Sequence, residues 1–125
     1  MTFARRLDPW APPLVLMAVI FFLSSQPNLN SGLGLLDLIG RKLIHFSEFA
    51  LLALLWWRAL GTRIDSRRAA LAAFFVTSLY AAGDEFHQSF VDGRNGSPID
   101  WLIDSAGAGL AMLWAGRSPR VGARA

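Results

Sequence analysis

Residues 69–90 read AALAAFFVTSLYAAGDEFHQSF, an apolar run that ends in a cluster of ionisable side chains. As a helix, this run is long enough to span the hydrocarbon core of a membrane, which takes about 20 residues. Similar runs are WAPPLVLMAVIFFLSSQ at 10–26, a segment from about 43 to 60 with the body HFSEFALLALLWWRAL, and PIDWLIDSAGAGLAMLWAG at 98–116. The sequence therefore predicts four helices.

The composition of these runs favours a membrane bundle over a soluble one. A soluble four-helix bundle carries a polar stripe along each helix. Here the central portions LVLMAVIFFL at 14–23 and LLALLWW at 51–57 are apolar all round. We therefore predict an all-α fold, an integral membrane four-helix bundle over residues 1–116, and a short basic tail, 117–125, that is disordered. A cleaved signal peptide is the alternative for the first run, although SSQP is a poor cleavage site.

The basic residues indicate the orientation of the bundle. Nine of the twelve lie before the first run, between the second and third runs, or after the fourth. They are Arg5, Arg6, Arg58, Arg63, Arg67, Arg68, Arg117, Arg120 and Arg124. With an even number of spans, these regions share one side of the membrane, which the positive-inside rule makes cytoplasmic. Both termini are therefore expected in the cytoplasm, and loops 27–41 and 91–97 outside.

Charge and composition also bear on partners. The basic residues form short clusters between apolar runs and accompany no groove-reading motif, so nucleic acid is excluded as a partner. The chain has no cysteine, which excludes disulfides and thiolate metal sites. The expected partner is the membrane lipid bilayer. A homodimer is a further expectation, because four thin helices leave little wall around a cavity.

Polar side chains gather at the outward ends of the predicted helices. At about 100° per residue, those of each helix fall on or near one face. The three faces carry Lys42, His45 and Glu48; Asp84, Glu85, His87 and Gln88; and Asp100 and Asp104. We expect these faces to point at one another just inside the outer surface of the membrane.

Charges at two of these helix ends oppose the helix dipole. Arg41 and Lys42 lie at the positive end of the second helix, and Asp84 and Glu85 near the negative end of the third. Each misplacement costs a few tenths to about 1 kcal/mol. We therefore predict that Arg41 or Lys42 pairs with Asp84 or Glu85. Asp100 lies at the start of its helix, where a carboxylate is favourable. A role as a helix cap would be enough to explain an acid at this position.

The cluster also carries an excess of negative charge. Three cations face five carboxylates, which leaves a balance of −2 when both histidines are neutral. These groups are Arg41, Lys42, Arg94, Glu48, Asp84, Glu85, Asp100 and Asp104. Intramembrane charge is costly and marks a functional site by default. Protonation, a water-filled cavity, a divalent cation or a cationic ligand would each relieve the excess.

Individual members of the cluster also have structural interpretations. His45 or His87, taken alone, can serve packing or hydrogen bonding, and Ser24 and Ser25 can satisfy the backbone at a helix end. The run SAGAGLA at 105–111 has small residues four apart, which favours close helix packing.

Two stretches resemble the signatures of VanZ-like membrane proteins. RKLIHFSEFALLALL at 41–55 is similar to K-x-x-H-F-x-E-(Y/F)-x-x-L, and LYAAGDEFHQSFVDGRNGSPIDWLIDSAGAGLA at 79–111 is similar to the second signature around D-E-x-H-Q. FFLSSQP at 21–27 resembles the usual end of the first helix in this family. The resemblance covers most of residues 14–116. Its characteristic polar positions fall on Lys42, His45, Glu48, Asp84, Glu85, His87, Gln88, Arg94, Asp100 and Asp104.

The resemblance implies a multi-pass protein of the bacterial cell (inner) membrane with a role in the cell envelope. The type member of the family is associated with resistance to teicoplanin, a lipid-tailed glycopeptide that acts at the outer cell surface. No settled reaction comes with the resemblance, so enzymatic activity stays open and no cofactor is assigned.

Three hypotheses of function follow. In the first, the polar site binds or modifies a polar-headed lipid, glycolipid or lipid-linked envelope precursor. The catalytic candidates are then His45, Glu48, Asp84, Glu85 and His87, and the substrate-binding candidates are Lys42, Gln88, Arg94, Asp100 and Asp104. The second is a metal-dependent membrane hydrolase. His45 with Glu48, and Glu85 with His87, would supply its nitrogen and carboxylate ligands for zinc or manganese. Against it, no H-E-x-x-H motif is present and Lys42 would compete with a cation for the acids. The third is a non-catalytic envelope assembly or shielding protein.

Overall fold

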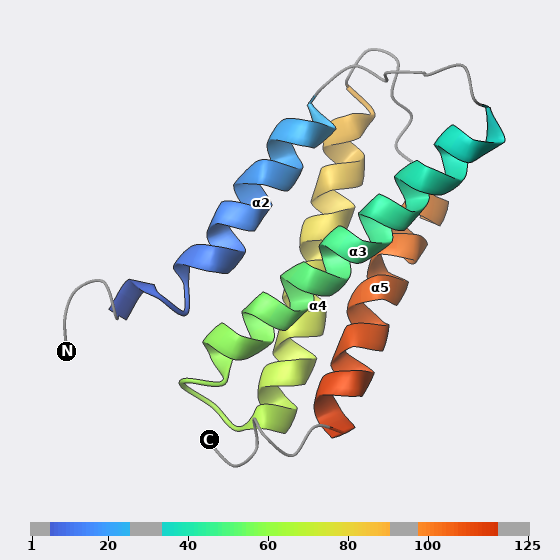
Figure 1. Cartoon of the computed structure of the whole chain (residues 1–125). Coiled ribbons are helices and arrows are strands. Elements are labelled where there is room, and N and C mark those ends of the chain that lie inside the picture. The colour runs from blue at the N-terminus through green and yellow to red at the C-terminus, as the bar shows by residue number, and fades with distance from the viewer. Residues whose placement is uncertain (1–5, 26–33, 91–97, 118–125) are drawn as a thin grey trace.

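The computed structural model describes residues 6–25, 34–90 and 98–117, and within these ranges the chain is helical without strands (Figure 1). Four long helices make up the fold: α2 (Ala11–Ser24), α3 (Leu35–Leu60), α4 (Ser66–Gln88) and α5 (Pro98–Arg117). The predicted all-α, four-helix architecture is therefore confirmed. Of the predicted tail, only Arg117 lies in the described residues, where it ends α5.

Local chemistry explains where most helices begin and end. α2 starts with prolines in its first turn, where a missing backbone N–H is tolerated. α4 starts at Ser66, three residues before the predicted run, because the Asp65 side chain caps it by accepting a hydrogen bond of 3.0 Å from the Arg68 backbone N–H. α5 starts at Pro98, where the sequence places it.

The start of α3 corrects the sequence prediction. The helix begins at Leu35, about eight residues before the expected start near Leu43, and follows Gly34, whose φ of 58° suits glycine. No proline interrupts residues 35–42, and Gly40 is tolerated within the helix. Arg41 and Lys42 consequently lie in the second turn. Because the dipole effect fades within the first turn, their predicted dipole penalty is smaller than expected.

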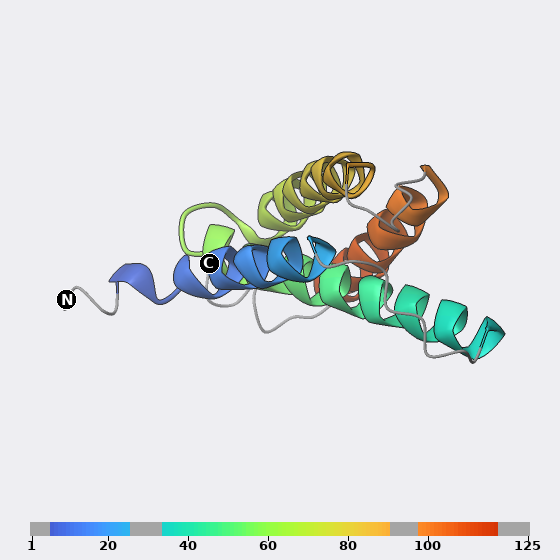
Figure 2. The same cartoon turned by 90° about the horizontal axis from the view of Figure 1, so that it is seen from above.

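The helices alternate in direction, and α3, α4 and α5 pack against one another. α2 contacts α3 and α4, and the view from above shows it beside α3 (Figure 2). α3 and α5 approach each other closely at Gly107, where an added Cβ would lie 2.4 Å from the Phe46 carbonyl oxygen. The predicted close packing through SAGAGLA is thus confirmed at this residue.

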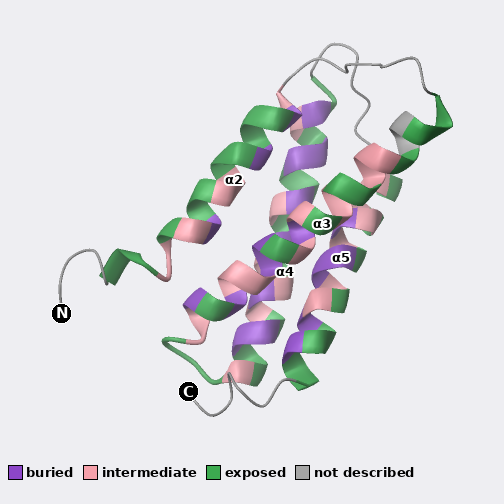
Figure 3. Cartoon of the chain, viewed as in Figure 1, coloured by how far each residue is buried: buried purple, intermediate pink, exposed green. Residues whose placement is uncertain are grey.

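Buried residues occur along the whole length of the bundle (Figure 3), but their chemistry differs between its two ends. We call the end where α3 finishes and α4 begins the alanine end, because six of the eight buried residues in its core are alanines. This core comprises Ala53, Trp57, Ala69, Ala70, Ala73, Ala108, Met112 and Ala115. A second cluster of Ile20, Phe49, Leu52 and Ala81 lies further along the bundle. The opposite end, where α2 and α4 finish and α3 and α5 begin, is the polar end.

The outer surface of the bundle is rich in large apolar side chains. Leu79 is 73% exposed and Leu113 is 64% exposed, and every helix contributes comparable residues. Within the described ranges, residues 39–60 form the one helical stretch that is both long and apolar enough to cross a membrane. α2 is apolar, but its 14 residues extend about 21 Å, less than a hydrocarbon core of about 30 Å. Length and composition thus support one of the four predicted spans.

Candidate functional site

Charged and polar side chains are buried at the polar end, where α2, α4 and α5 supply them. The buried members are Ser24, Asp84, Glu85, Gln88 and Asp104. Asp104 is 0% exposed. Buried groups of this kind are stable only when hydrogen bonds, opposite charges or bound ions compensate for lost hydration. The contacts of each side chain determine which of these groups regain the hydrogen bonds that they lose on burial.

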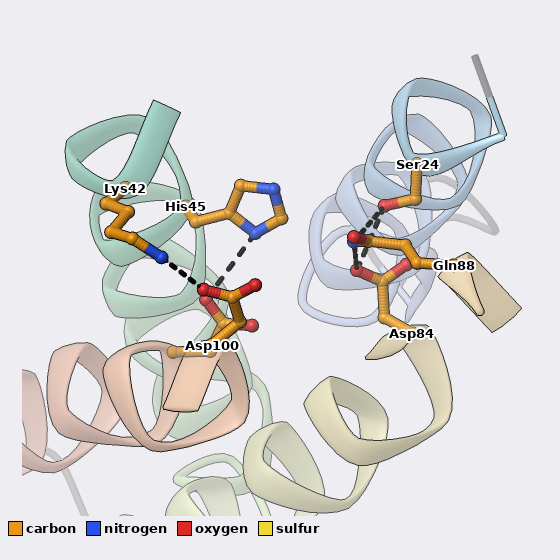
Figure 4. A network of polar contacts seen from close by, with 7 residues as sticks. Ser24, Lys42, His45, Asp84, Gln88 and Asp100 are labelled. Carbon is orange, nitrogen blue, oxygen red and sulfur yellow. Dashed lines mark hydrogen bonds and ion pairs between the residues drawn. The ribbon is translucent and has the colours of Figure 1, made fainter. Parts of the chain in front are cut away.

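One part of the site joins α2 to α4. The Ser24 hydroxyl donates a hydrogen bond of 2.9 Å to Asp84 Oδ2, and Gln88 Nε2 donates one of 3.0 Å to the same oxygen (Figure 4). Asp84 and Gln88 are one turn apart on α4, so both reach the end of α2. These bonds hold the last turn of α2 against α4.

His87 also faces α2. Its Nε2 lies 3.0 Å from the Ser25 hydroxyl, and its ring stacks on Phe21 with the ring centroids 4.3 Å apart. The structure therefore places His87 beside the end of α2, away from the polar contacts of His45. Its predicted catalytic role stays a prediction.

A second part of the site joins α3 to α5. Lys42 Nζ forms an ion pair with Asp100 Oδ1, and His45 Nδ1 lies 3.5 Å from Asp104 Oδ1. Figure 4 shows Lys42, His45 and Asp100 together, facing the group made by Ser24, Asp84 and Gln88.

This geometry corrects the predictions for Lys42 and Asp100. Lys42 pairs with Asp100, so the Lys42 alternative of the predicted pairing with Asp84 or Glu85 is wrong, and a role as a cap is not the whole account of Asp100. The physical reason is the close packing at Gly107, which brings the start of α5 against α3 and places an acid within reach of the Lys42 side chain. A pairing of Arg41 with Asp84 or Glu85 stays a prediction.

Three ionisable groups meet between these two parts. Potential ligand atoms of His45, Glu85 and Asp104 all lie within 4.8 Å of one another, although the residues come from α3, α4 and α5. The structure therefore brings together one member of each polar face that the sequence identified.

A cavity of about 130 Å³ opens beside this group, between α2 and α3. Its lining comprises Leu23, Ser24, Arg41, Ile44, His45 and Glu48. An apolar groove of about 340 Å³ adjoins it along the same two helices, lined by Leu16, Leu43, Ile44, Ser47, Glu48 and Leu51. Ile44 and Glu48 line both. A polar space and an apolar space thus share a border at Glu48.

A larger cavity of about 500 Å³ lies between α4 and α5 and is lined mostly by apolar residues, with Arg67 among them. It includes none of the polar residues of the site, and we do not assign it to the same function.

The sequence did not predict that Ser24 bonds to Asp84. It suggested only that the Ser24 hydroxyl forms a hydrogen bond with the backbone at the end of its helix. The available signal was its place in FFLSSQP, among the segments that carry the resemblance.

Arg94, a predicted substrate-binding residue, lies outside the described residues. The catalytic and substrate-binding roles assigned to the other nine residues remain predictions.

Comparison with known proteins gave one match. A family model described as VanZ/LLP1 matches residues 10–116. This range contains all four helices except the last residue of α5. Searches of curated proteins and of solved structures returned no match.

Proposed function

The chain belongs to the VanZ/LLP1 family, and from this premise we propose that it is a multi-pass protein of the bacterial inner membrane that binds a polar-headed lipid or lipid-linked envelope precursor at its polar end. Family association links such a protein to the cell envelope and to glycopeptide resistance. The proposal includes binding; a chemical step on the bound lipid is left open.

The distribution of side chains supports the membrane location. Large apolar residues such as Leu79 and Leu113 face outward, whereas Asp84 and Asp104 are buried. Water-soluble proteins bury apolar groups and rarely bury unpaired acids. In a bilayer this arrangement is the favourable one, because exposed apolar side chains contact lipid and charged side chains avoid it by facing the interior of the bundle.

The shared border of the polar cavity and the apolar groove is the observation that carries the proposal. Arg41 and His45 line the cavity, where a guanidinium group is suited to a phosphate or carboxylate. Leu16, Leu43 and Leu51 line the groove, where an acyl chain would lie. A polar head in one space and an apolar tail in the other match the two halves of a lipid.

The position of the basic residues supports an outward-facing polar end. Arg58 lies in the last turn of α3, Arg67 and Arg68 in the first turn of α4, and Arg117 at the end of α5, all at the alanine end. The positive-inside rule places that end in the cytoplasm. The polar end then opens toward the envelope, where a lipid-linked precursor is accessible.

Blocking the groove tests lipid binding. We expect Leu51→Trp to reduce the lipid retained through purification, because the larger side chain fills the groove that Leu51 lines. Leu79→Trp is the matched control, because Leu79 is 73% exposed and lines neither space. Mass spectrometry of lipids extracted from the two purified variants gives the measurement. Equal retention of the same lipids in both variants would reject the groove as the tail site.

Substitution at the polar end tests the cellular role. In a host where the protein lowers susceptibility to teicoplanin, Glu85→Ala and His87→Ala should each abolish the effect without lowering membrane abundance. Growth inhibition and quantitative immunoblotting of membranes are the measurements. Full activity in both variants would refute the role assigned to the site.

Topology can be tested directly because the chain has no cysteine. In spheroplasts, Phe90→Cys just after α4 should react with a membrane-impermeant maleimide, since it lies at the polar end. Arg63→Cys between α3 and α4 should react only after permeabilisation. Labelling of both residues in intact spheroplasts would contradict a spanning arrangement.

A further inference from the structure

The group formed by His45, Glu85 and Asp104 has the composition of a metal site. Imidazole nitrogen and carboxylate oxygen are ligands of zinc and of similar divalent transition metals. Their potential ligand atoms lie within 4.8 Å of one another, and each residue comes from a different helix. A motif on a single helix, such as H-E-x-x-H, would therefore not reveal this group in the sequence.

Asp104 supplies an independent observation. The residue is 0% exposed, and within the described part of the chain neither of its carboxylate oxygens accepts a hydrogen bond. Its nearest ionisable neighbour is His45, whose buried Nδ1 makes no hydrogen bond either. A buried carboxylate without such partners costs several kcal/mol. Either a proton on His45, which would make an ion pair with Asp104, or a bound cation would supply the compensating charge.

The spacing of these atoms fits a bound ion. His45 Nδ1 and Asp104 Oδ1 are 3.5 Å apart and do not form a hydrogen bond. Bonds of about 2.0–2.2 Å in a tetrahedral arrangement place neighbouring ligand atoms about 3.3–3.6 Å apart. The three ligand atoms lie within 4.8 Å of one another, so a side-chain adjustment of at most about 1.5 Å brings Glu85 to that spacing.

The contacts of Lys42 remove an objection to a metal. An ammonium group near the acids would compete with a cation, but Lys42 is held by Asp100 in an ion pair. Asp104 and Glu85 would then offer carboxylate oxygens to a divalent cation, and His45 would offer a neutral imidazole nitrogen. A fourth position would be taken by water or by the second oxygen of Asp104.

From this geometry we infer that His45, Glu85 and Asp104 bind one divalent transition metal ion, with Zn²⁺ as the best match. A histidine ligand disfavours Mg²⁺ and Ca²⁺, which select oxygen atoms. The absence of cysteine leaves no thiolate to select a softer ion. The inference goes beyond lipid binding and does not depend on it.

The alternative is a proton in place of the metal, shared among the same three groups. Purified protein in nanodiscs, treated with chelator and then dialysed against Zn²⁺, distinguishes the two. We expect one zinc per chain by elemental analysis, and a visible absorption spectrum of four-coordinate Co²⁺ when Co²⁺ replaces zinc. Less than a tenth of an equivalent of either metal at saturation would overturn the site.

Variants test the ligand set. Asp104→Asn and Glu85→Gln keep the side-chain shape and should weaken Zn²⁺ binding by more than the about 10- to 100-fold that loss of an outer-shell partner costs. Asp84→Asn is the matched control: this buried acid accepts hydrogen bonds from Ser24 and Gln88 and should keep its zinc. Zinc should raise the melting temperature of the wild type and the control, but not of Asp104→Asn.

Unchanged zinc affinity in Asp104→Asn and Glu85→Gln would overturn the assignment, as would equal loss in Asp84→Asn. Gel filtration of each variant confirms that it is folded. Lipid retained by the same samples is measured separately. Protein that retains lipid but binds no zinc would overturn the metal site alone, whereas protein that binds zinc but no lipid would overturn the lipid proposal alone.

Discussion

The alanine end and the polar end of the bundle are packed from opposite kinds of side chain. At the alanine end, Ala53, Ala69, Ala73, Ala108 and Ala115 are each 0% exposed and bring α3, α4 and α5 into close contact. At the polar end, acids are buried between the same helices, and among the described residues neither carboxylate oxygen of Asp104 accepts a hydrogen bond. Small apolar residues let helices approach closely, whereas buried acids without partners lower stability. The comparison indicates that the alanine end stabilises the fold, and the unusual packing of the polar end supports the proposal that it binds a ligand.

The junction of the two ends should show the largest effect. Gly107→Ala places a Cβ 2.4 Å from the Phe46 carbonyl oxygen, so α3 and α5 must separate. We expect a loss of stability at the upper end of the about 1–3 kcal/mol typical of overpacking. Denaturant unfolding in detergent followed by circular dichroism gives the value. Gly116→Ala is the control, because nothing lies within 4 Å of its added Cβ, and equal effects of the two would contradict the close crossing.

Matched substitutions at the two ends should change the free energy of unfolding by different amounts or in opposite directions. Ala73→Leu overfills the alanine end and should cost about 1–3 kcal/mol, whereas the exposed Ala82→Leu on the same helix should cost much less. After chelator treatment, Asp104→Asn should leave stability unchanged or raise it, because it removes a buried charge. The same unfolding experiment measures all three.

This contrast also separates a binding site from a purely structural cluster. If Asp104→Asn unfolded as readily as Ala73→Leu, the polar end would serve stability, and the protein would fit the non-catalytic assembly or shielding hypothesis. Stability retained with loss of zinc binding or of the cellular effect would support a functional site.

The smallest effect is expected at the surface of the alanine end. Arg58 forms an ion pair of 2.8 Å with Asp8, and both side chains are at least half exposed. Exposed ion pairs contribute about 0–1 kcal/mol. Arg58→Ala should therefore change the free energy of unfolding by less than about 1 kcal/mol, and this difference should shrink at high salt. A larger effect would mean that the alanine end relies on charge as well as on packing.

Much of the fold followed from local patterns, and the exceptions have local causes. The apolar runs located all four helices, and the small residues of 105–111 located the close crossing. The early start of α3 was missed because SGLGLLDLIG at 31–40 contains three glycines, which favour a loop, although Gly40 lies within the helix. Ser24 was missed because a hydroxyl at a helix end usually bonds to its own backbone, and only the nearby Asp84 gives it another partner.

By itself, the sequence determined that the chain forms four helices and that His45, Glu85 and Asp104 lie on polar faces near one end of their helices. The helical repeat sets the angle of each side chain about its own axis, and this angle can be read from spacing alone. Only the tertiary structure decided that Lys42 pairs with Asp100 and that the other three groups meet. Those contacts depend on how each helix is rotated and shifted against its neighbours. The close approach of α3 and α5 at Gly107 helps to set this arrangement, which cannot be derived from the sequence of one helix alone.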